Sequence, residues 1–205
     1  MSSNMRAWTL HELPELVTEL GGDVTTLLQQ FSISRRQLES ADATLPSATF
    51  IRLLEFCARE LNCPDFGLRL GFRLGPEALG PIVLMAKHCE TAGEAALEIA
   101  SYMHAYIPAL NLQLAPLNRE ARRLVFNVTV TRAGSTRQFL EWCMGVSLRN
   151  LKLLAGESTA PYAINFSHPA LLPINTYRRF FGSPVHFGEE FTSLDIDDNL
   201  FFGVV

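Results

Sequence analysis

The chain of 205 residues contains few cysteines, few charged residues and no long apolar run. Its four cysteines lack the C-x-x-C spacing of redox and zinc motifs and lie among apolar or helical residues, as reduced thiols do. No stretch reaches the roughly 18 apolar residues that a membrane span requires, and the N-terminus lacks the apolar region of a signal peptide. These absences argue against a secreted disulfide scaffold or a membrane protein, and we expect a cytoplasmic chain.

Basic residues are also in short supply. Seventeen lysines and arginines against 21 acidic residues give a net charge of −4, whereas a domain that binds nucleic acid by itself needs positive charge to neutralise phosphates. We therefore expect no direct DNA binding by this chain. With 48% hydrophobic residues, a chain of this length can bury roughly 70% of the surface that its unfolded form exposes.

Catalytic and nucleotide-binding motifs are missing as well. The chain has no Walker glycine loop, no G-x-G-x-x-G, no G-x-S-x-G elbow and no H-E-x-x-H helix. His88 and Cys89 are adjacent, but neighbours on a helix point about 100° apart and rarely reach one metal ion. His168 precedes a proline and is interpreted as a turn residue that hydrogen-bonds to backbone. We predict no metal, no cofactor and no catalytic centre; an enzyme that uses Cys89 or Cys143 beside a histidine is a remaining alternative.

Helical patterns dominate the first third of the chain. Apolar residues recur three and four positions apart, and glycine, proline and helix-capping residues such as Asp23 separate the runs. The patterns predict helices over 10–20, 23–31, 47–61 and 66–74. We therefore expect residues 1–78 to form a helical part.

From residue 79 onward, helical and strand periods alternate. Helical spacing continues to Ile107 with a break near Thr91, where Thr91 and Glu94 form a capping box at the start of a second helix. The patterns then predict strands over 110–114 and 124–130, a long helix over 135–154, a strand over 162–166, a helix over 175–181, and strands over 185–187 and 191–196. We expect one α+β domain over 1–205, in which 79–205 packs helices on a small, mostly antiparallel sheet.

One set of aromatic side chains is a candidate for a small-molecule pocket. The hairpin and the long helix should face each other, and aromatic walls suit a mostly apolar pocket. The candidate residues are Tyr102, Tyr106, Phe126 and Trp142. Packing in the core is the alternative for an aromatic run at a helix end.

A second set is a candidate for a dimer surface. Apolar residues opposite the core face of the long helix would offer such a surface, and the candidates are Leu140, Met144, Leu148 and Leu151. The alternative is a helix that is buried on both sides. Arg137, in the first turn of this helix, opposes the helix dipole, and either an anion or solvent could compensate for it.

Several different short motifs follow one another along nearly the whole chain in a characteristic order. They include Gly21-Gly22-Asp23, Cys63-Pro64-Asp65-Phe66-Gly67, Leu79-Gly80-Pro81, His168-Pro169-Ala170 and Phe181-Gly182-Ser183-Pro184-Val185-His186-Phe187-Gly188. In this order the motifs resemble the N-terminal domain of a branch of AraC-type bacterial transcription regulators, a domain labelled arabinose-binding-like.

The resemblance implies a sensor and dimerisation domain, followed by a C-terminal segment with two helix-turn-helix units that bind DNA. We expect the chain to be a fragment that lacks this C-terminal segment. The parent protein would then contact DNA only through the C-terminal segment. The resemblance further implies a homodimer and a small-molecule effector that it does not name, and contact with RNA polymerase is another option. The alternative is a ligand-free domain for oligomerisation or protein docking.

Overall fold

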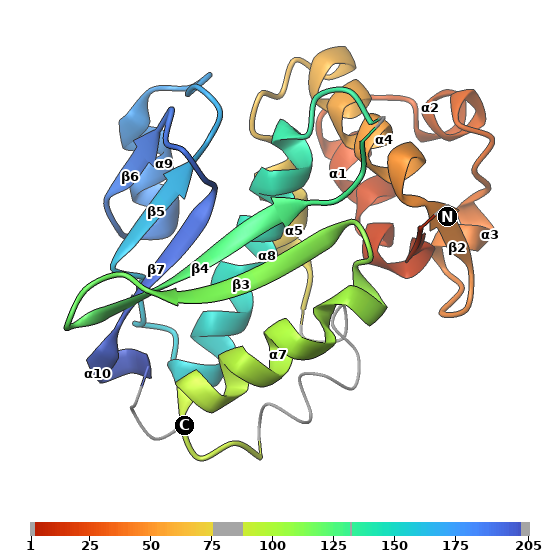
Figure 1. The fold of residues 1–205 in the computed structure, drawn as a ribbon. Coiled ribbons are helices and arrows are strands. Elements are labelled where there is room, and N and C mark those ends of the chain that lie inside the picture. The colour runs from red at the N-terminus through yellow and green to blue at the C-terminus, as the bar shows by residue number, and fades with distance from the viewer. Residues whose placement is uncertain (1–2, 76–87, 132, 202–205) are drawn as a thin grey trace.

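The computed structural model describes residues 3–75, 88–131 and 133–201 (Figure 1). A helical part comes first along the chain, and a five-stranded sheet with further helices follows it. This arrangement confirms the α+β class. The predicted helix ahead of Thr91 falls largely on 76–87, outside the described residues.

The first part combines short helices with a small sheet. Strands β1 (Asn4–Arg6) and β2 (Thr44–Pro46) pair antiparallel, and neither was predicted because three residues are too few to display a period. The helices are η1 (Ala7–Leu10), α1 (Leu13–Glu19), α2 (Val24–Gln30), α3 (Arg35–Leu38), α4 (Ser47–Glu60) and α5 (Phe66–Arg73). Helix α1 begins later than predicted, with Pro14 in its first turn, where the missing N–H costs nothing.

The second part is organised around a sheet with the strand order β3-β4-β7-β5-β6. The strands are β3 (Leu110–Pro116), β4 (Ala121–Val128), β5 (Ala163–Phe166), β6 (Val185–Phe187) and β7 (Ser193–Asp197). Strands β3 and β4 form the predicted hairpin, and β7 pairs antiparallel with β4 and β5. Because only β5 and β6 run parallel, the sheet is mostly antiparallel, as expected.

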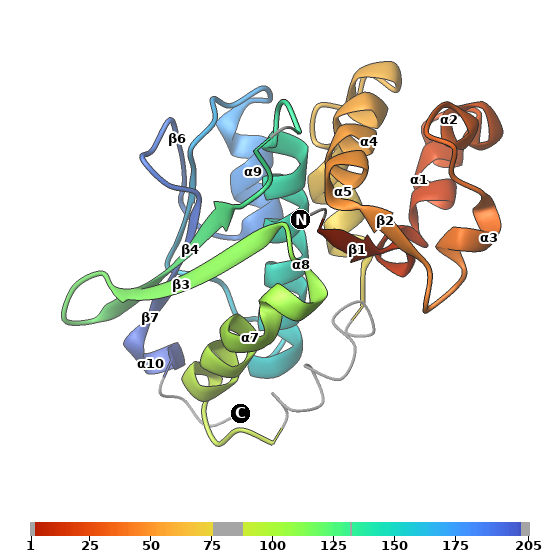
Figure 2. The ribbon, with the colours of Figure 1, turned by 45° about the vertical axis from the view of Figure 1, so that its right-hand side comes forward.

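Helix α8 (Arg137–Ala155) lies between the two parts, with α4 and α5 on one side and the sheet on the other (Figures 1 and 2). The remaining helices are α7 (Ala92–Tyr106), α9 (Ile174–Phe181) and α10 (Asp198–Phe201). Leu140, Met144 and Leu148, expected on an exposed apolar face of α8, are at most 6% exposed, and Leu151 is half-buried. Helix α8 is buried on both sides: α4 and α5 pack against the side that carries Phe139, Trp142 and Gly145, and the apolar residues on the opposite side are buried as well.

Three glycines allow α5 and α8 to pack very closely. A Cβ added at Gly67 or Gly71 would lie well inside the van der Waals distance of the carbonyl oxygen of Gln138 or Trp142, respectively. From the other helix, a Cβ at Gly145 would lie 2.7 Å from the carbonyl oxygen of Leu68. The order of these contacts shows that the two helices run in the same direction.

Side chains also tie the beginnings of the two helices together. Oε1 of Gln138 accepts a hydrogen bond from the Gly67 N–H at 2.6 Å, and its Nε2 donates to the Pro64 carbonyl at 2.7 Å. Glu55 of α4 accepts from the backbone N–H of Gln138 and from the Ser135 hydroxyl, both at 2.8 Å. The first N–H groups of a helix have no partner within the helix, so Gln138 caps α5 and Glu55 caps α8, where its negative charge also suits the dipole.

We predict that Gly71→Ala destabilises the chain by about 2 kcal/mol. Overpacking a core costs about 1 to 3 kcal/mol, and the obstacle at Gly71 is backbone that cannot rotate away, while alanine regains up to about 1 kcal/mol in helix propensity. Urea unfolding followed by circular dichroism measures the change. Gln29→Ala on the exposed side of α2 is the control, and equal stability of the two variants would contradict the close packing.

Candidate functional site

Four ionisable side chains meet in the interior beside the first half of α8. Glu141 is fully buried, and its Oε1 accepts a hydrogen bond from the hydroxyl of Tyr177 in α9 at 3.4 Å. Nε2 of His168, in the loop after β5, lies 3.8 Å from the same oxygen. Arg137 lies one turn before Glu141 on α8. We refer to Arg137, Glu141, His168 and Tyr177 as the α8 polar cluster.

Three polar atoms of the α8 polar cluster have no hydrogen-bond partner in the protein. They are Nη1 of Arg137, Oε2 of Glu141 and Nε2 of His168, and each is shielded from solvent. An unpaired buried polar group costs about 1 to 3 kcal/mol, and native interiors contain few of them. The cluster therefore has hydrogen-bonding capacity that this chain does not use, which a polar ligand group or a water molecule can satisfy.

The ring of His168 presents an acceptor to Glu141. Its Nδ1 lies 3.1 Å from the carbonyl oxygen of Pro169, which can only accept, so Nδ1 carries the hydrogen of the neutral ring. This contact confirms the predicted turn residue bonded to backbone. Nε2 is then an unprotonated nitrogen that faces the carboxyl group, and the pair is favourable when Glu141 is protonated.

Burial favours the uncharged forms of both Glu141 and His168. Loss of solvation raises the pKa of Glu141 to about 8, although the nearby Arg137 guanidinium acts in the opposite direction. Burial likewise lowers the pKa of His168, more than its backbone hydrogen bond raises it. At pH 7 the contact of 3.8 Å thus joins a neutral acid to a neutral imidazole rather than two opposite charges.

Aromatic rings provide the apolar surroundings of the cluster. The His168 ring lies 4.8 Å from that of Phe166, and the Tyr177 ring lies 4.8 Å from that of Phe187, measured between centroids. Loss of solvation raises the pKa of Tyr177 as well, so its hydroxyl remains a donor at neutral pH. The cluster can recognise hydrogen-bonding groups and hold a proton, but it contains no activated nucleophile.

The sequence pointed to parts of this cluster and missed its centre. Arg137 is half-buried, and its Nη2 donates to the Pro64 carbonyl at 3.2 Å, so protein backbone replaces the anion or solvent that was considered. Glu141 was overlooked although it lies between Phe139 and Trp142, both on the apolar side of the long helix. A carboxylate within an apolar stripe was the available signal, since burying such a group requires a special environment.

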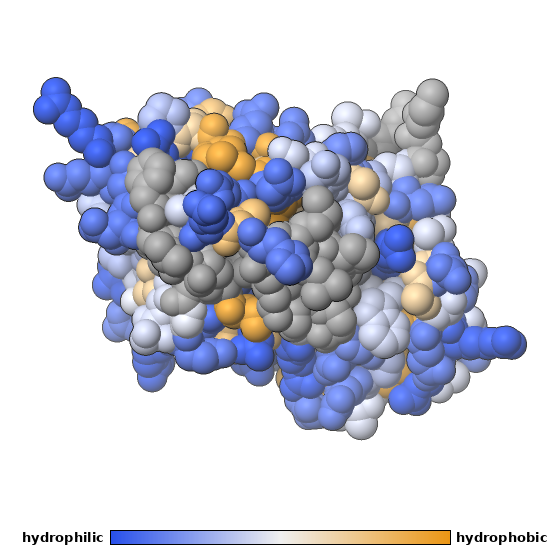
Figure 3. Space-filling model, turned by 90° about the horizontal axis from the view of Figure 1, so that it is seen from below, coloured by the Kyte–Doolittle hydropathy of each residue, from blue (hydrophilic) through white to orange (hydrophobic). Residues whose placement is uncertain are grey.

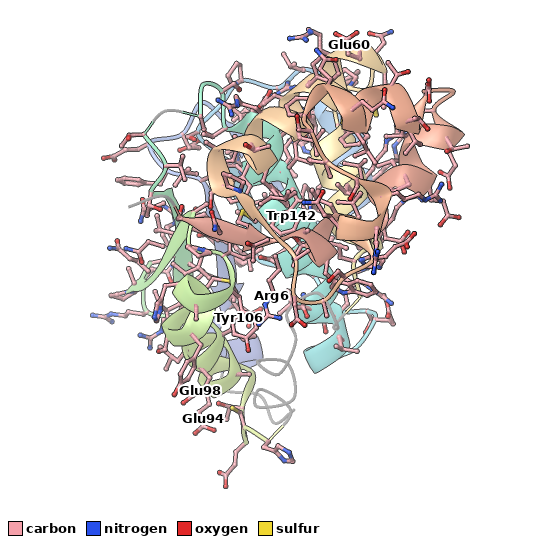
Figure 4. All side chains as sticks on the ribbon, turned by 90° about the vertical axis from the view of Figure 1, so that its right-hand side faces the viewer. Arg6, Glu60, Glu94, Glu98, Tyr106 and Trp142 are labelled. Carbon is pink, nitrogen blue, oxygen red and sulfur yellow. The ribbon has the colours of Figure 1, made fainter. Side chains whose placement is uncertain are left out.

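The structure does not bring the four predicted pocket aromatics together. Tyr102 is 46% exposed on the outer side of α7, whereas Phe126 and Trp142 lie in the core at 4% and 1%. Tyr106 is half-buried beneath the guanidinium of Arg6, which lies 5.6 Å from the ring centroid (Figure 4). The pocket that these residues were expected to line remains a prediction.

Trp142 nevertheless has an unusual feature. Its ring lies 5.2 Å from that of Phe50 and 5.9 Å from that of Phe139, between centroids, as in ordinary core packing. Its Nε1, however, is buried without a hydrogen-bond partner in the protein. An indole usually places this donor opposite an acceptor when buried.

The cysteines show no sign of nucleophilic activation. Burial raises the pKa of Cys143, and burial together with Glu94 and Glu98 raises that of Cys89, so both stay protonated at neutral pH. Within the described parts of the chain, no group of three histidine, cysteine or acidic side chains could hold a metal ion. Nor does any helix there combine the length and apolar character that crossing a bilayer demands.

We predict that the free energy of unfolding of the wild-type chain, measured relative to that of the Glu141→Gln variant, falls as pH rises from about 4.5 to about 8. The folded chain holds the Glu141 proton more tightly than the unfolded chain, whose ordinary pKa is 4.5. This contribution is complete below pH 4.5 and is lost toward pH 8, by up to about 1.4 kcal/mol per pH unit. Urea unfolding at several pH values measures it. Glu190→Gln removes an exposed carboxylate as a control, and a pH-independent difference between wild type and Glu141→Gln would refute the shift.

Comparison with known proteins finds a matching family model and a curated relative. The family model described as the arabinose-binding domain of AraC transcription regulators, N-terminal, matches residues 21–201. The HTH-type transcriptional regulator VirS of Mycobacterium tuberculosis, found in two strains, is 31% identical over 201 residues, which is 98% of this chain and 59% of VirS. The chain thus spans less than two thirds of the length of this curated relative.

A solved structure has the same fold. The crystal structure of the transcriptional regulator CdpR from Pseudomonas aeruginosa aligns with a TM-score of 0.66 over 88% of this chain and 55% of CdpR, at 16% identity. At that identity the likeness concerns the fold alone. The family match, by contrast, extends from just before α2 to α10, and with it the chain belongs to the family of N-terminal arabinose-binding-type domains of AraC transcription regulators.

Proposed function

We propose that this chain is the effector-sensing and dimerising domain of a cytoplasmic AraC-type regulator and controls DNA binding by a helix-turn-helix domain of the same protein. Its family and its relative VirS, named as an HTH-type regulator, support a regulatory role. The net charge of −4 fits a domain that leaves DNA to another segment.

The sensing role is supported mainly by the α8 polar cluster, whose buried polar atoms lack hydrogen-bond partners in the protein. Nη1 of Arg137, Oε2 of Glu141 and Nε2 of His168 are buried without protein partners, which offers a ligand a guanidinium donor, a carboxyl oxygen and an imidazole acceptor. A small effector with both donor and acceptor groups would satisfy them and displace water. Trp142 is the predicted aromatic that we retain for the pocket, because its buried Nε1 lacks a partner.

The position of the cluster suggests how binding would be transmitted. Helix α8 carries Arg137 and Glu141 and packs against α5, while His168 and Tyr177 belong to the part that contains the sheet. An effector that prefers one arrangement of these elements shifts the population toward it. The attached DNA-binding domains would then adopt a different mutual geometry.

A ligand-free oligomerisation or docking domain is the second candidate. Ordered water can pair the same buried atoms, and the family membership of the chain fits either role. The two candidates differ in whether a small molecule stabilises the native state.

We predict that a panel of small polar metabolites, each tested at 1 mM by thermal unfolding, contains a compound that stabilises the chain. A ligand at 100 times its Kd adds about 2.7 kcal/mol, which raises Tm by roughly 5 to 10 °C for a domain of this size. Glu141→Leu should lose most of this shift, since it removes both the donor and the acceptor of the neutral carboxyl group.

Glu190→Gln, on the surface, should keep the full shift. Trp142→Phe keeps an aromatic ring but removes the unpaired Nε1, and it tests whether that donor contributes. If neither the panel nor a cytosolic extract raises Tm while the chain still self-associates, the ligand-free candidate replaces the sensor.

A further inference from the structure

The α8 polar cluster contains a guanidinium group that pairs with no carboxylate of the described residues. Nη2 of Arg137 donates to the Pro64 carbonyl, and its Nη1 is buried without a partner. Charge at a protein surface is stabilised by water, and Figure 3 shows one face of this molecule covered mostly by hydrophilic side chains. The buried Nη1 lacks that water, and an anion compensates for it more strongly than a neutral group does.

The carboxylates whose charge acts on the cluster are engaged elsewhere. Asp65 pairs with Arg69 at 3.0 Å, and Glu55 accepts hydrogen bonds at the beginning of α8. Glu141, the carboxyl group of the cluster itself, is protonated at pH 7, because loss of solvation raises its pKa to about 8. The positive charge of Arg137 is therefore available to a ligand.

The contact with Tyr177 indicates which oxygen of Glu141 carries the proton. Oε1 accepts the hydrogen bond from the Tyr177 hydroxyl at 3.4 Å, whereas Oε2 is buried without a partner. The proton of the neutral acid then belongs on Oε2, where it is a donor that lacks an acceptor. Two unpaired donors, one of them charged, form the pattern that a carboxylate group of a ligand accepts.

The third unpaired atom of the cluster requires a donor from the ligand. Nε2 of His168 is an acceptor, since Nδ1 carries the ring hydrogen, and at 3.8 Å from Glu141 it is too distant for a hydrogen bond. A hydroxyl group of the ligand can donate to it. An ammonium group fits less well, because it would place a second positive charge beside Arg137.

We propose that the α8 polar cluster binds a small hydroxycarboxylic acid as its monoanion. The carboxylate accepts from Nη1 of Arg137 and from the carboxyl group of Glu141, and the hydroxyl donates to Nε2 of His168. The carbon chain lies against aromatic rings near the cluster, such as those of Phe166 and Phe187. The proposal rests on the sensing role proposed above and names the chemical class of the ligand.

Isothermal titration calorimetry with three matched compounds tests this assignment. 2-Hydroxybutyrate carries all the required groups, butyrate lacks the hydroxyl, and 2-hydroxybutyramide lacks the negative charge. At pH 7 we expect 2-hydroxybutyrate to bind about tenfold more tightly than either of the others, since each lost partner leaves a buried polar atom unpaired. Equal affinity for the acid and its amide would overturn the carboxylate class.

Arginine variants determine where the anion binds. Arg137→Gln should weaken the binding of 2-hydroxybutyrate about tenfold and affect 2-hydroxybutyramide much less, because only the acid uses the charge. Arg178→Gln is the matched control, since Arg178 lines an open surface hollow with Asn175 and Arg179 that can attract anions nonspecifically. A loss of affinity in Arg178→Gln rather than in Arg137→Gln would place the acid in that hollow and overturn the site. The Tm of each variant without ligand establishes that it is folded.

The proton on Glu141 provides a readout that a merely structural role would not change. A bound anion stabilises the protonated acid, so at pH 8, where Glu141 is about half protonated, binding takes up to about half a proton from the buffer. The pKa values of His168 and Tyr177 are shifted away from this pH, to lower and higher values respectively. Calorimetry in two buffers with different ionisation enthalpies measures the uptake. Glu141→Gln keeps a neutral donor and acceptor, and should bind with similar affinity but without proton uptake.

The outcomes separate the ligand class from the sensing role. Failure of 2-hydroxybutyrate to bind at about 10 mM overturns the hydroxycarboxylic acid. The sensing role still stands if a neutral or cationic metabolite raises Tm and Glu141→Leu abolishes that effect. If no metabolite raises Tm either, the ligand class and the sensing role fail together.

Discussion

The close contact between α5 and α8 is the constraint on which the rest of the structure depends. Gly67, Gly71 and Gly145 remove the side chains that would separate the helices, and backbone then meets backbone. Gln138 and Glu55 add hydrogen bonds that satisfy the beginnings of both helices. Because α5 belongs to the helical part and α8 lies against the sheet, this contact joins the two parts through a buried interface rather than through a linker.

The same contact explains why ionisable groups are tolerated in the interior. With α5 on one side and α9 on the other, α8 holds Glu141 where solvent cannot reach it, and the carboxyl group is neutral at pH 7. Tyr177 and His168 then face a protonated acid. Buried polar groups stabilise a fold little, but they distinguish strongly between arrangements because an unpaired one is costly. Such a cluster suits a domain whose role is to respond to a bound molecule.

Periodicity in the sequence predicted the hairpin, the long helix and the mostly antiparallel sheet, because each follows from local patterns of apolar residues. It could not show what packs against α8, and Leu140, Met144 and Leu148 were therefore assigned to an exposed face that is buried. Glu141 was missed for a related reason. Its partners, His168 and Tyr177, come from a loop and a helix that are distant in sequence. A search for sequence motifs cannot detect contacts between residues that only the fold brings together. The family, in contrast, was recognisable from short motifs in order.

Hydrogen–deuterium exchange of the intact chain, resolved by segment, would test most directly whether the α5 and α8 contact makes one cooperative unit. If it does, the amides of α5 and of the first half of α8 open with the same free energy, equal to that of global unfolding, and respond together to urea. Alternatively, the amides of α5 and of the preceding helices could open together at a clearly lower free energy than those of α8. The two parts would then open separately, and the buried site would not depend on the contact between α5 and α8.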